Sequence, residues 1–113
     1  SPKDSARIIV DHVIKGIEIA RKNNIPDRVI DFIRSHHGTT LVFYFYKKQK
    51  DIDENVNEED FIYPGPLPFS REIAILMMAD SVEAASNWKP LQLQIVSHYY
   101  VQVVLSFSCI MMI

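Results

Sequence analysis

The adjacent histidines His36 and His37, followed at once by Gly38, are the feature that most constrains how this chain folds. They close an apolar segment with helical spacing. A third histidine, His12, lies in an earlier segment of the same kind, and the carboxylate of Asp80 lies in a later one. These four side chains can converge only if the three segments are helices that pack against one another.

This set of residues suits a transition metal. Neutral imidazole is the commonest side-chain ligand of zinc, iron, nickel and copper, and carboxylate oxygen suits manganese and iron. Successive helical residues point about 100° apart, so His36 and His37 can share a metal only near the helix end, where the chain can bend at Gly38. The alternative is structural, because a protonated histidine in the last turn of a helix is stabilised by the helix dipole. Spacing alone leaves both interpretations open.

Apolar residues recur with helical periodicity over residues 2–23, 26–37 and 71–86. Ser1 and Ser70 are the expected N-caps of the first and last helices, and Gly38 is the expected C-terminal cap of the second. The last helix is apolar almost all round, so we expect it at the centre of the fold. Asp80 is then a buried carboxylate that needs a cation, a metal or several hydrogen-bond donors.

The remaining segments are less regular. Residues 39–50 combine strand-forming side chains with helical spacing and a basic end, and in an otherwise helical chain we favour a helix. Residues 51–69 are expected to form a long solvated loop, because they hold a block of acidic side chains followed by prolines. Residues 91–113 lack Lys, Arg, Asp and Glu, but their scattered polar side chains argue against a membrane span. The predicted fold class is an all-α helical bundle.

Length, charge and cysteine count limit the classes of protein to which this chain can belong. A chain of 113 residues suggests one domain. A net charge of -2 gives no sign of the basic face that binds a nucleic-acid polymer. The single cysteine, Cys109, excludes an internal disulfide framework and fits a reducing compartment.

Three strings carry a family resemblance: SARIIVDHVIKGIEIARK (5–22), IPDRVIDFIRSHHGTTLV (25–42) and YPGPLPFSREIAILMMADSVEAAS (63–86). They resemble the C-terminal part of the HD-superfamily phosphohydrolase domain of bacterial seven-transmembrane HD membrane proteins, which hydrolyse cyclic di-AMP. HHGTT and ADSVEAAS distinguish this group from HD proteins that act on cyclic di-GMP, whose histidine pair leads into a Gly-Tyr-Pro motif. We therefore expect part of an HD domain over residues 1–87 and an apolar tail unlike the family over residues 88–113.

The resemblance implies a helical bundle around two metals, iron or manganese above all, with nickel or zinc as alternatives. The ligands of the family run in the order His, His-Asp dyad, single His, His-His and Asp. By that order His12 is the single histidine, His36 and His37 are the pair that completes one metal site, and Asp80 is the last, catalytic aspartate, a ligand of the other metal. The first histidine and the dyad belong upstream of Ser1, so we expect the chain to be a fragment.

The implied function is hydrolysis of a cyclic dinucleotide, most of all cyclic di-AMP, by metal-activated water. The implied location is the cytoplasmic domain of a bacterial inner-membrane protein. Arg34, Thr39 and Thr40 flank the histidine pair and are the expected substrate-binding residues. The fragment is expected to have little activity and to self-associate, because a truncated bundle exposes apolar surface. The alternative is a non-catalytic nucleotide-sensing or protein-interaction helical module.

Overall fold

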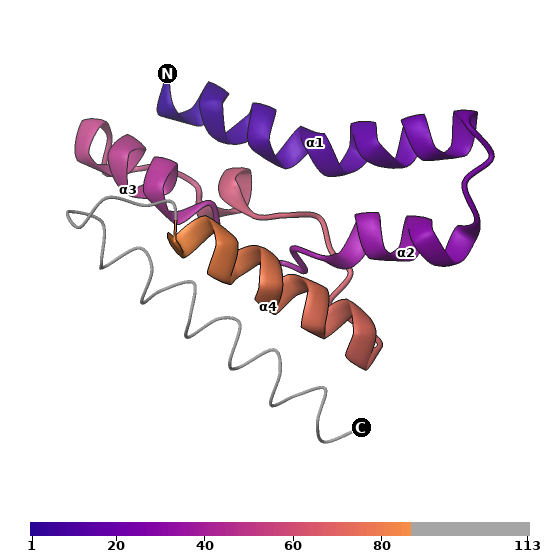
Figure 1. Ribbon diagram of the computed structural model, residues 1–113. Helices are drawn as coiled ribbons and strands as arrows, with labels where there is room; N and C mark the ends of the chain where they lie inside the picture. Colours follow the sequence, from indigo (N-terminus) through magenta and orange to yellow (C-terminus); the bar gives the residue numbers. More distant parts are fainter. Residues whose placement is uncertain (87–113) are drawn as a thin grey trace.

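The computed structural model describes residues 1–86 of the chain (Figure 1), so the predictions for residues 88–113 lie outside the described part. The elements in order are α1 (Pro2–Lys22), α2 (Asp27–Ser35), α3 (Phe43–Ile52), the short 3-10 helix η1 (Glu58–Phe61) and α4 (Arg71–Ser86). The all-α class is confirmed. The β pairing within residues 1–86 is a single antiparallel bridge between Leu41 and Ile62. None of the helices in this region combines the length and apolar character needed to cross a membrane.

Helix α1 is the element against which most of the described fold packs (Figure 1), because α2, α3 and η1 all contact it. Its buried residues Ala6, Val13 and Ala20 are spaced by seven, which is two helical turns, so they form one stripe. Ser1 caps the helix as predicted: its hydroxyl accepts a hydrogen bond from the Asp4 amide, and the Asp4 carboxylate accepts one from the Ser1 backbone.

Close packing of α1 on α2 depends on Gly16. A Cβ atom at this position would lie 3.0 Å from Cγ2 of Ile33, which is closer than carbon atoms normally approach. The two helices are joined by a short turn in which Asn24 has a φ of 52°. Ile25 then donates its backbone N–H to the Ala20 carbonyl at 3.0 Å, which ties this turn to the end of α1.

The helix predicted over residues 39–50 is confirmed in type but begins only at Phe43. The residues before it are not helical because their backbone pairs with a distant segment: the Val42 amide donates to the Phe61 carbonyl at 2.8 Å, and the Tyr63 amide donates to the Thr40 carbonyl at 3.0 Å. The acidic block of the predicted loop is exposed as expected. The loop is nevertheless anchored, because Phe61 and Tyr63 are buried in the core.

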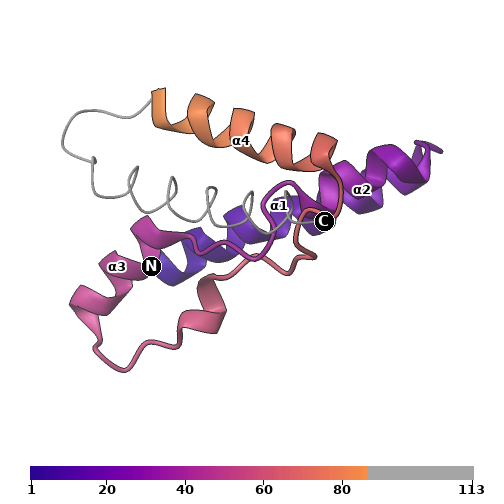
Figure 2. The same cartoon turned by 90° about the horizontal axis from the view of Figure 1, so that it is seen from below.

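Helix α4 has the predicted extent, and the Ser70 hydroxyl accepts a hydrogen bond from the Ile73 amide at 3.2 Å. The prediction of a central position was wrong for the described fold. Among the named elements α4 contacts α2, and Figure 2 shows it on the side of the molecule away from η1. Ile73, Ala74 and Met77 are buried, whereas the other apolar face is exposed at Ile75, Leu76 and Val82. One-sided packing also leaves the Asp80 side chain 43% exposed, so the prediction of a buried carboxylate was wrong too.

Replacing Gly16 by leucine is expected to lower the free energy of unfolding by about 1–2 kcal/mol, because overpacking at Ile33 outweighs the better helix propensity of leucine. Denaturant unfolding followed by circular dichroism measures this change. The control is Lys15→Leu, which places the same side chain at the exposed neighbouring position and is expected to change stability by less than about 0.5 kcal/mol. Equal losses in both variants would contradict close packing at Gly16.

Candidate metal centre

The histidine pair lies where α2 gives way to a tight turn. The helix ends at Ser35, two residues earlier than predicted, with His36 as its C-terminal cap. The Ser35 hydroxyl donates a hydrogen bond to the Asp31 carbonyl, and the Gly38 amide donates to the Ser35 carbonyl at 3.0 Å. Gly38 itself has a φ of 55°, a left-handed conformation that glycine adopts without strain. The chain therefore bends at Gly38, as the sequence indicated.

The structure brings three of the four predicted metal ligands together. His12 comes from α1, and His36 and His37 come from the end of α2. One ring nitrogen from each lies within 4.8 Å of the other two. The ring centroid of His12 lies 5.7 Å from that of His36 and 5.0 Å from that of His37. The centroids of His36 and His37 are 4.0 Å apart. Side chains remote in sequence thus form one cluster of imidazoles.

Two of the imidazoles are oriented by their own helices. The Nδ1 atom of His12 contacts the Ile9 carbonyl, and Nδ1 of His36 lies 2.8 Å from the Ile33 carbonyl. A carbonyl oxygen can only accept a hydrogen bond, so chemistry assigns the proton to Nδ1 in both rings. The Nε2 atoms then carry the free lone pairs, which is the arrangement found in metal-ligating histidines.

The third imidazole, His37, is partly buried, with 18% of its side chain exposed. Burial, together with smaller contributions from the neighbouring His36 and His12, lowers the pKa of His37 to about 3. The ring is therefore neutral at physiological pH and has a lone pair to offer. It stacks on the ring of Tyr63, with centroids 4.3 Å apart and planes inclined by 13°.

Asp80 lies next to this cluster without being part of it. Its Oδ2 atom is 3.6 Å from Nδ1 of His37, which is longer than a hydrogen bond. Within residues 1–86, the group whose ligand atoms all lie within 4.8 Å of one another consists of the three histidines. The structure therefore places the Asp80 carboxylate near Nδ1 of His37, and the role of Asp80 as a metal ligand stays a prediction.

The three predicted substrate-binding residues lie around the histidine turn in different settings. Thr40 is buried, and its hydroxyl donates to the His37 carbonyl at 2.8 Å, so it braces the turn. Thr39 is exposed. Arg34 is largely exposed and pairs with Asp31 at 2.7 Å. Thr39 and Arg34 are accessible to a ligand, whereas Thr40 is engaged with the backbone.

The histidine cluster fits a metal ion. Zinc–nitrogen bonds of about 2.0–2.1 Å separate cis or tetrahedral ligand atoms by about 3–3.4 Å. The observed separations of up to 4.8 Å therefore need a contraction of about 1–2 Å, which rotation of the rings can supply. Three neutral imidazoles leave other positions on the metal open, as in catalytic rather than structural sites.

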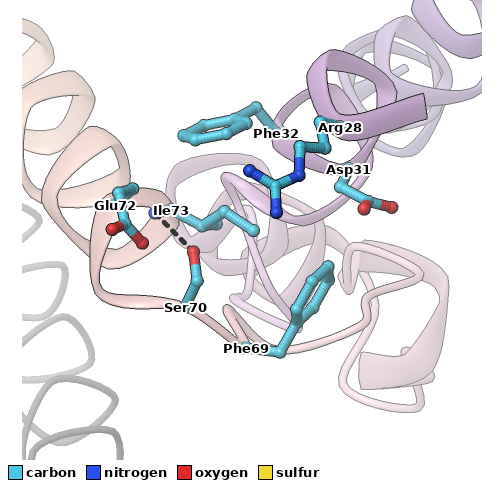
Figure 3. A pocket seen from close by; sticks show the side chains of 7 residues that line it. All are labelled: Arg28, Asp31, Phe32, Phe69, Ser70, Glu72 and Ile73. Carbon is cyan, nitrogen blue, oxygen red and sulfur yellow. Dashed lines mark hydrogen bonds between the residues drawn. The ribbon is translucent and has the colours of Figure 1, made fainter. Parts of the chain in front are cut away.

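A separate pocket of about 480 Å³ opens between the N-terminal ends of α2 and α4 (Figure 3). In this view the guanidinium of Arg28 lies between the rings of Phe32 and Phe69, and Ile73 lies to its left. The lining includes carboxylates from Asp31 and Glu72 but none of the three histidines. The pocket therefore combines both charges with aromatic walls and is distinct from the imidazole cluster.

Comparison with known proteins identifies relatives of this chain. No protein-family model matches the chain. The chain is 47% identical over 85 residues to the cyclic-di-AMP phosphodiesterase PgpH of Listeria monocytogenes and 45% identical over 85 residues to PgpH of Bacillus subtilis. Both matches span 75% of this chain and 12% of the relative.

A solved structure is also similar to this chain. The HD domain of the phosphodiesterase PgpH from L. monocytogenes, in complex with cyclic-di-AMP, superimposes with a TM-score of 0.78 at 40% sequence identity. The superposition covers 95% of this chain and 51% of that domain. The chain thus spans about one eighth of the length of the curated relatives and about half of the solved domain.

The metal-free chain is expected to lose stability as the pH falls below about 6.5. The folded state holds the pKa of His37 at about 3, whereas the unfolded state has the ordinary value of 6.5. Between these values the unfolded state binds the extra proton, so the stability present above pH 6.5 falls by up to about 1.4 kcal/mol per pH unit. Unfolding in denaturant and chelator at pH 7, 6 and 5 measures this slope.

The matched control for this slope is His37→Phe, which keeps a planar ring against Tyr63 but cannot be protonated. Between pH 7 and pH 5 the stability of this variant is expected to fall by about 2 kcal/mol less than that of the unsubstituted chain. An unchanged slope in His37→Phe would show that other groups cause it.

Proposed function

The chain is part of an HD domain of the PgpH family, and we propose that it supplies the three-histidine half of the active site of a cyclic-di-AMP phosphodiesterase. The observation that carries the proposal is the convergence of His12, His36 and His37 at the α1–α2 contact. Similarity to the cyclic-di-AMP-bound PgpH domain supports the substrate class.

The residues of this chain would prepare one metal site. His12 and His36 would bind through Nε2, because their Nδ1 atoms face carbonyl oxygens. His37 would bind as a neutral ring held in a partly buried position, where no proton has to be displaced at neutral pH. A divalent transition metal, iron or manganese by resemblance, supplies Lewis acidity toward the phosphodiester and a water nucleophile when bound.

Asp80 would serve the second metal of the pair and act in catalysis. Its carboxylate is next to His37, and nearly half of the side chain is exposed. The carboxylate is therefore accessible to a metal whose other ligands come from outside residues 1–86. Thr39 and Arg34, both exposed near the histidine turn, would contact the cyclic dinucleotide, and Thr40 would hold the turn in place.

We extend the proposal to the setting of the domain. By the resemblance, the parent protein is anchored in a bacterial inner membrane with this domain in the cytoplasm. The isolated chain would self-associate through exposed apolar side chains on α1 and α4, which are Ile8, Ile19, Ile75, Leu76 and Val82. Ultracentrifugation over a range of concentrations tests this, and a monomer throughout that range would contradict it.

The purified chain is expected to bind one equivalent of Mn²⁺, Fe²⁺ or Zn²⁺ and to be stabilised by it, because the folded state alone presents the three imidazoles together. Elemental analysis after dialysis and the melting temperature with and without metal measure this. Replacing both His36 and His37 by alanine is expected to abolish both effects. Arg21→Ala, an exposed change on the same helix as His12, is the control. Metal retained by the double variant would overturn the assignment.

The metal-loaded chain is expected to hydrolyse cyclic di-AMP far more slowly than the complete HD domain, because it holds one of the two proposed metal sites. Chromatographic separation of the linear product from the cyclic substrate measures the rate, with the L. monocytogenes PgpH HD domain as reference. Turnover equal to that of the reference would contradict the half-site proposal. Tight binding of cyclic di-AMP to the chelator-treated chain, measured by calorimetry, would instead favour the nucleotide-sensing alternative.

A further inference from the structure

The three imidazoles of the cluster are not held in the same way. His12 and His36 each direct Nδ1 to a carbonyl three residues earlier on the same helix. His37 lies beyond the end of α2, and within residues 1–86 its ring makes no comparable hydrogen bond to a carbonyl. Its Nδ1 atom has the Asp80 carboxylate at 3.6 Å, which is too long for a hydrogen bond. Another contact must therefore set the orientation of this ring.

The aromatic ring that stacks on His37 is Tyr63. The two rings are nearly parallel, 13° apart in inclination, with centroids separated by 4.3 Å. The Tyr63 ring also meets the edge of His12 at 6.0 Å, so it borders two of the three imidazoles. Stacked aromatic pairs of this kind stabilise one relative orientation beyond simple burial.

Tyr63 is itself fixed from several sides. It is 4% exposed and belongs to the core cluster with Ala6, Val13 and Phe61. Its amide donates to the Thr40 carbonyl at 3.0 Å, and the Thr40 hydroxyl donates to the His37 carbonyl at 2.8 Å. The backbone segment that carries Tyr63 is thus tied directly to the turn that carries His37.

The same two segments touch again two residues further along. Gly65 has a φ of 77°, and a Cβ atom there would lie 3.0 Å from Cγ2 of Thr39. A residue with a side chain at this position would push the loop away from the histidine turn. The close fit keeps the Tyr63 ring against His37.

We propose that Tyr63 is a positioning residue of the metal centre, which holds the His37 imidazole in its ligating orientation by stacking, as carbonyls do for His12 and His36. This inference rests on the proposed function. Tyr63 does not touch the metal in this account and acts only through His37. Because one face of its ring is covered by His37 and the residue is buried, it is not a surface on which an adenine base stacks.

The test compares Tyr63→Phe, which keeps the stacked ring, with Tyr63→Leu, which removes it. The affinity of the chain for Zn²⁺ is measured by competition with a chromophoric chelator. Tyr63→Leu is expected to weaken Zn²⁺ binding by about 10–100-fold, the range seen when partners that orient a metal ligand are lost. Tyr63→Phe is expected to stay close to the parent value.

The control is Phe61→Leu, a change of the same kind at a fully buried residue of the same core cluster. The Phe61 ring contacts that of Tyr46, with centroids 5.6 Å apart, and not a histidine. This variant is expected to lower the melting temperature without a comparable loss of Zn²⁺ affinity. Equal losses of affinity in Phe61→Leu and Tyr63→Leu would overturn the positioning role in favour of general destabilisation.

A second readout needs no metal. The ring protons of His37 in the chelator-treated chain are shielded by the current of a stacked aromatic ring, and their NMR signals are assigned by their loss in His37→Phe. They are expected to shift downfield in Tyr63→Leu and to remain in place in Tyr63→Phe. Unmoved signals in Tyr63→Leu would overturn the inference. If the unsubstituted chain binds no metal, the proposed function is overturned. The NMR signals then still decide whether Tyr63 orients His37.

Discussion

The contact between Gly16 and Ile33 is the constraint on which the metal centre depends. Gly16 lies one turn after His12 on α1, and Ile33 lies one turn before His36 on α2. The side chain of Ile33 packs on Gly16, while its backbone carbonyl orients the His36 ring. One residue therefore sets both the distance between the helices and the direction of a ligand, so the spacing of α1 and α2 determines whether the three imidazoles can meet.

The sequence predicted those features that depend on local pattern. Helical periodicity of apolar residues indicated α1, Ser1 and Ser70 were correctly identified as caps, and the bend at Gly38 was expected from its identity. Convergence of His12 with the histidine pair was expected only if their helices packed together, and the structure brings the three rings together. The ligand roles themselves stay predictions, as do those of Asp80, Arg34, Thr39 and Thr40.

The errors have a common physical origin in contacts between distant segments. The start of α3 shifted because residues 40–42 pair with the backbone at 61–63. Helix α4 was expected at the centre because its composition is apolar. Composition does not determine which neighbours cover a helix, and in the structure one apolar face of α4 is exposed. Tyr63 lies in the segment 51–69 that was expected to form a solvated loop. Its contact with His37 could not be predicted, because nothing in the local sequence specifies how a long loop returns to the helix end.

The different ways in which the imidazoles are held imply an order of assembly. The hydrogen bonds of His12 and His36 to carbonyls three residues earlier form as soon as each helix forms. The stack on His37 requires closure of the loop from residue 37 to residue 63, which carries an entropic cost that helix formation does not. The orientations of two of the imidazoles thus belong to early local structure, and that of the third belongs to a later event. A brief local opening of the loop would release His37 alone and leave a two-histidine site on an intact helical pair.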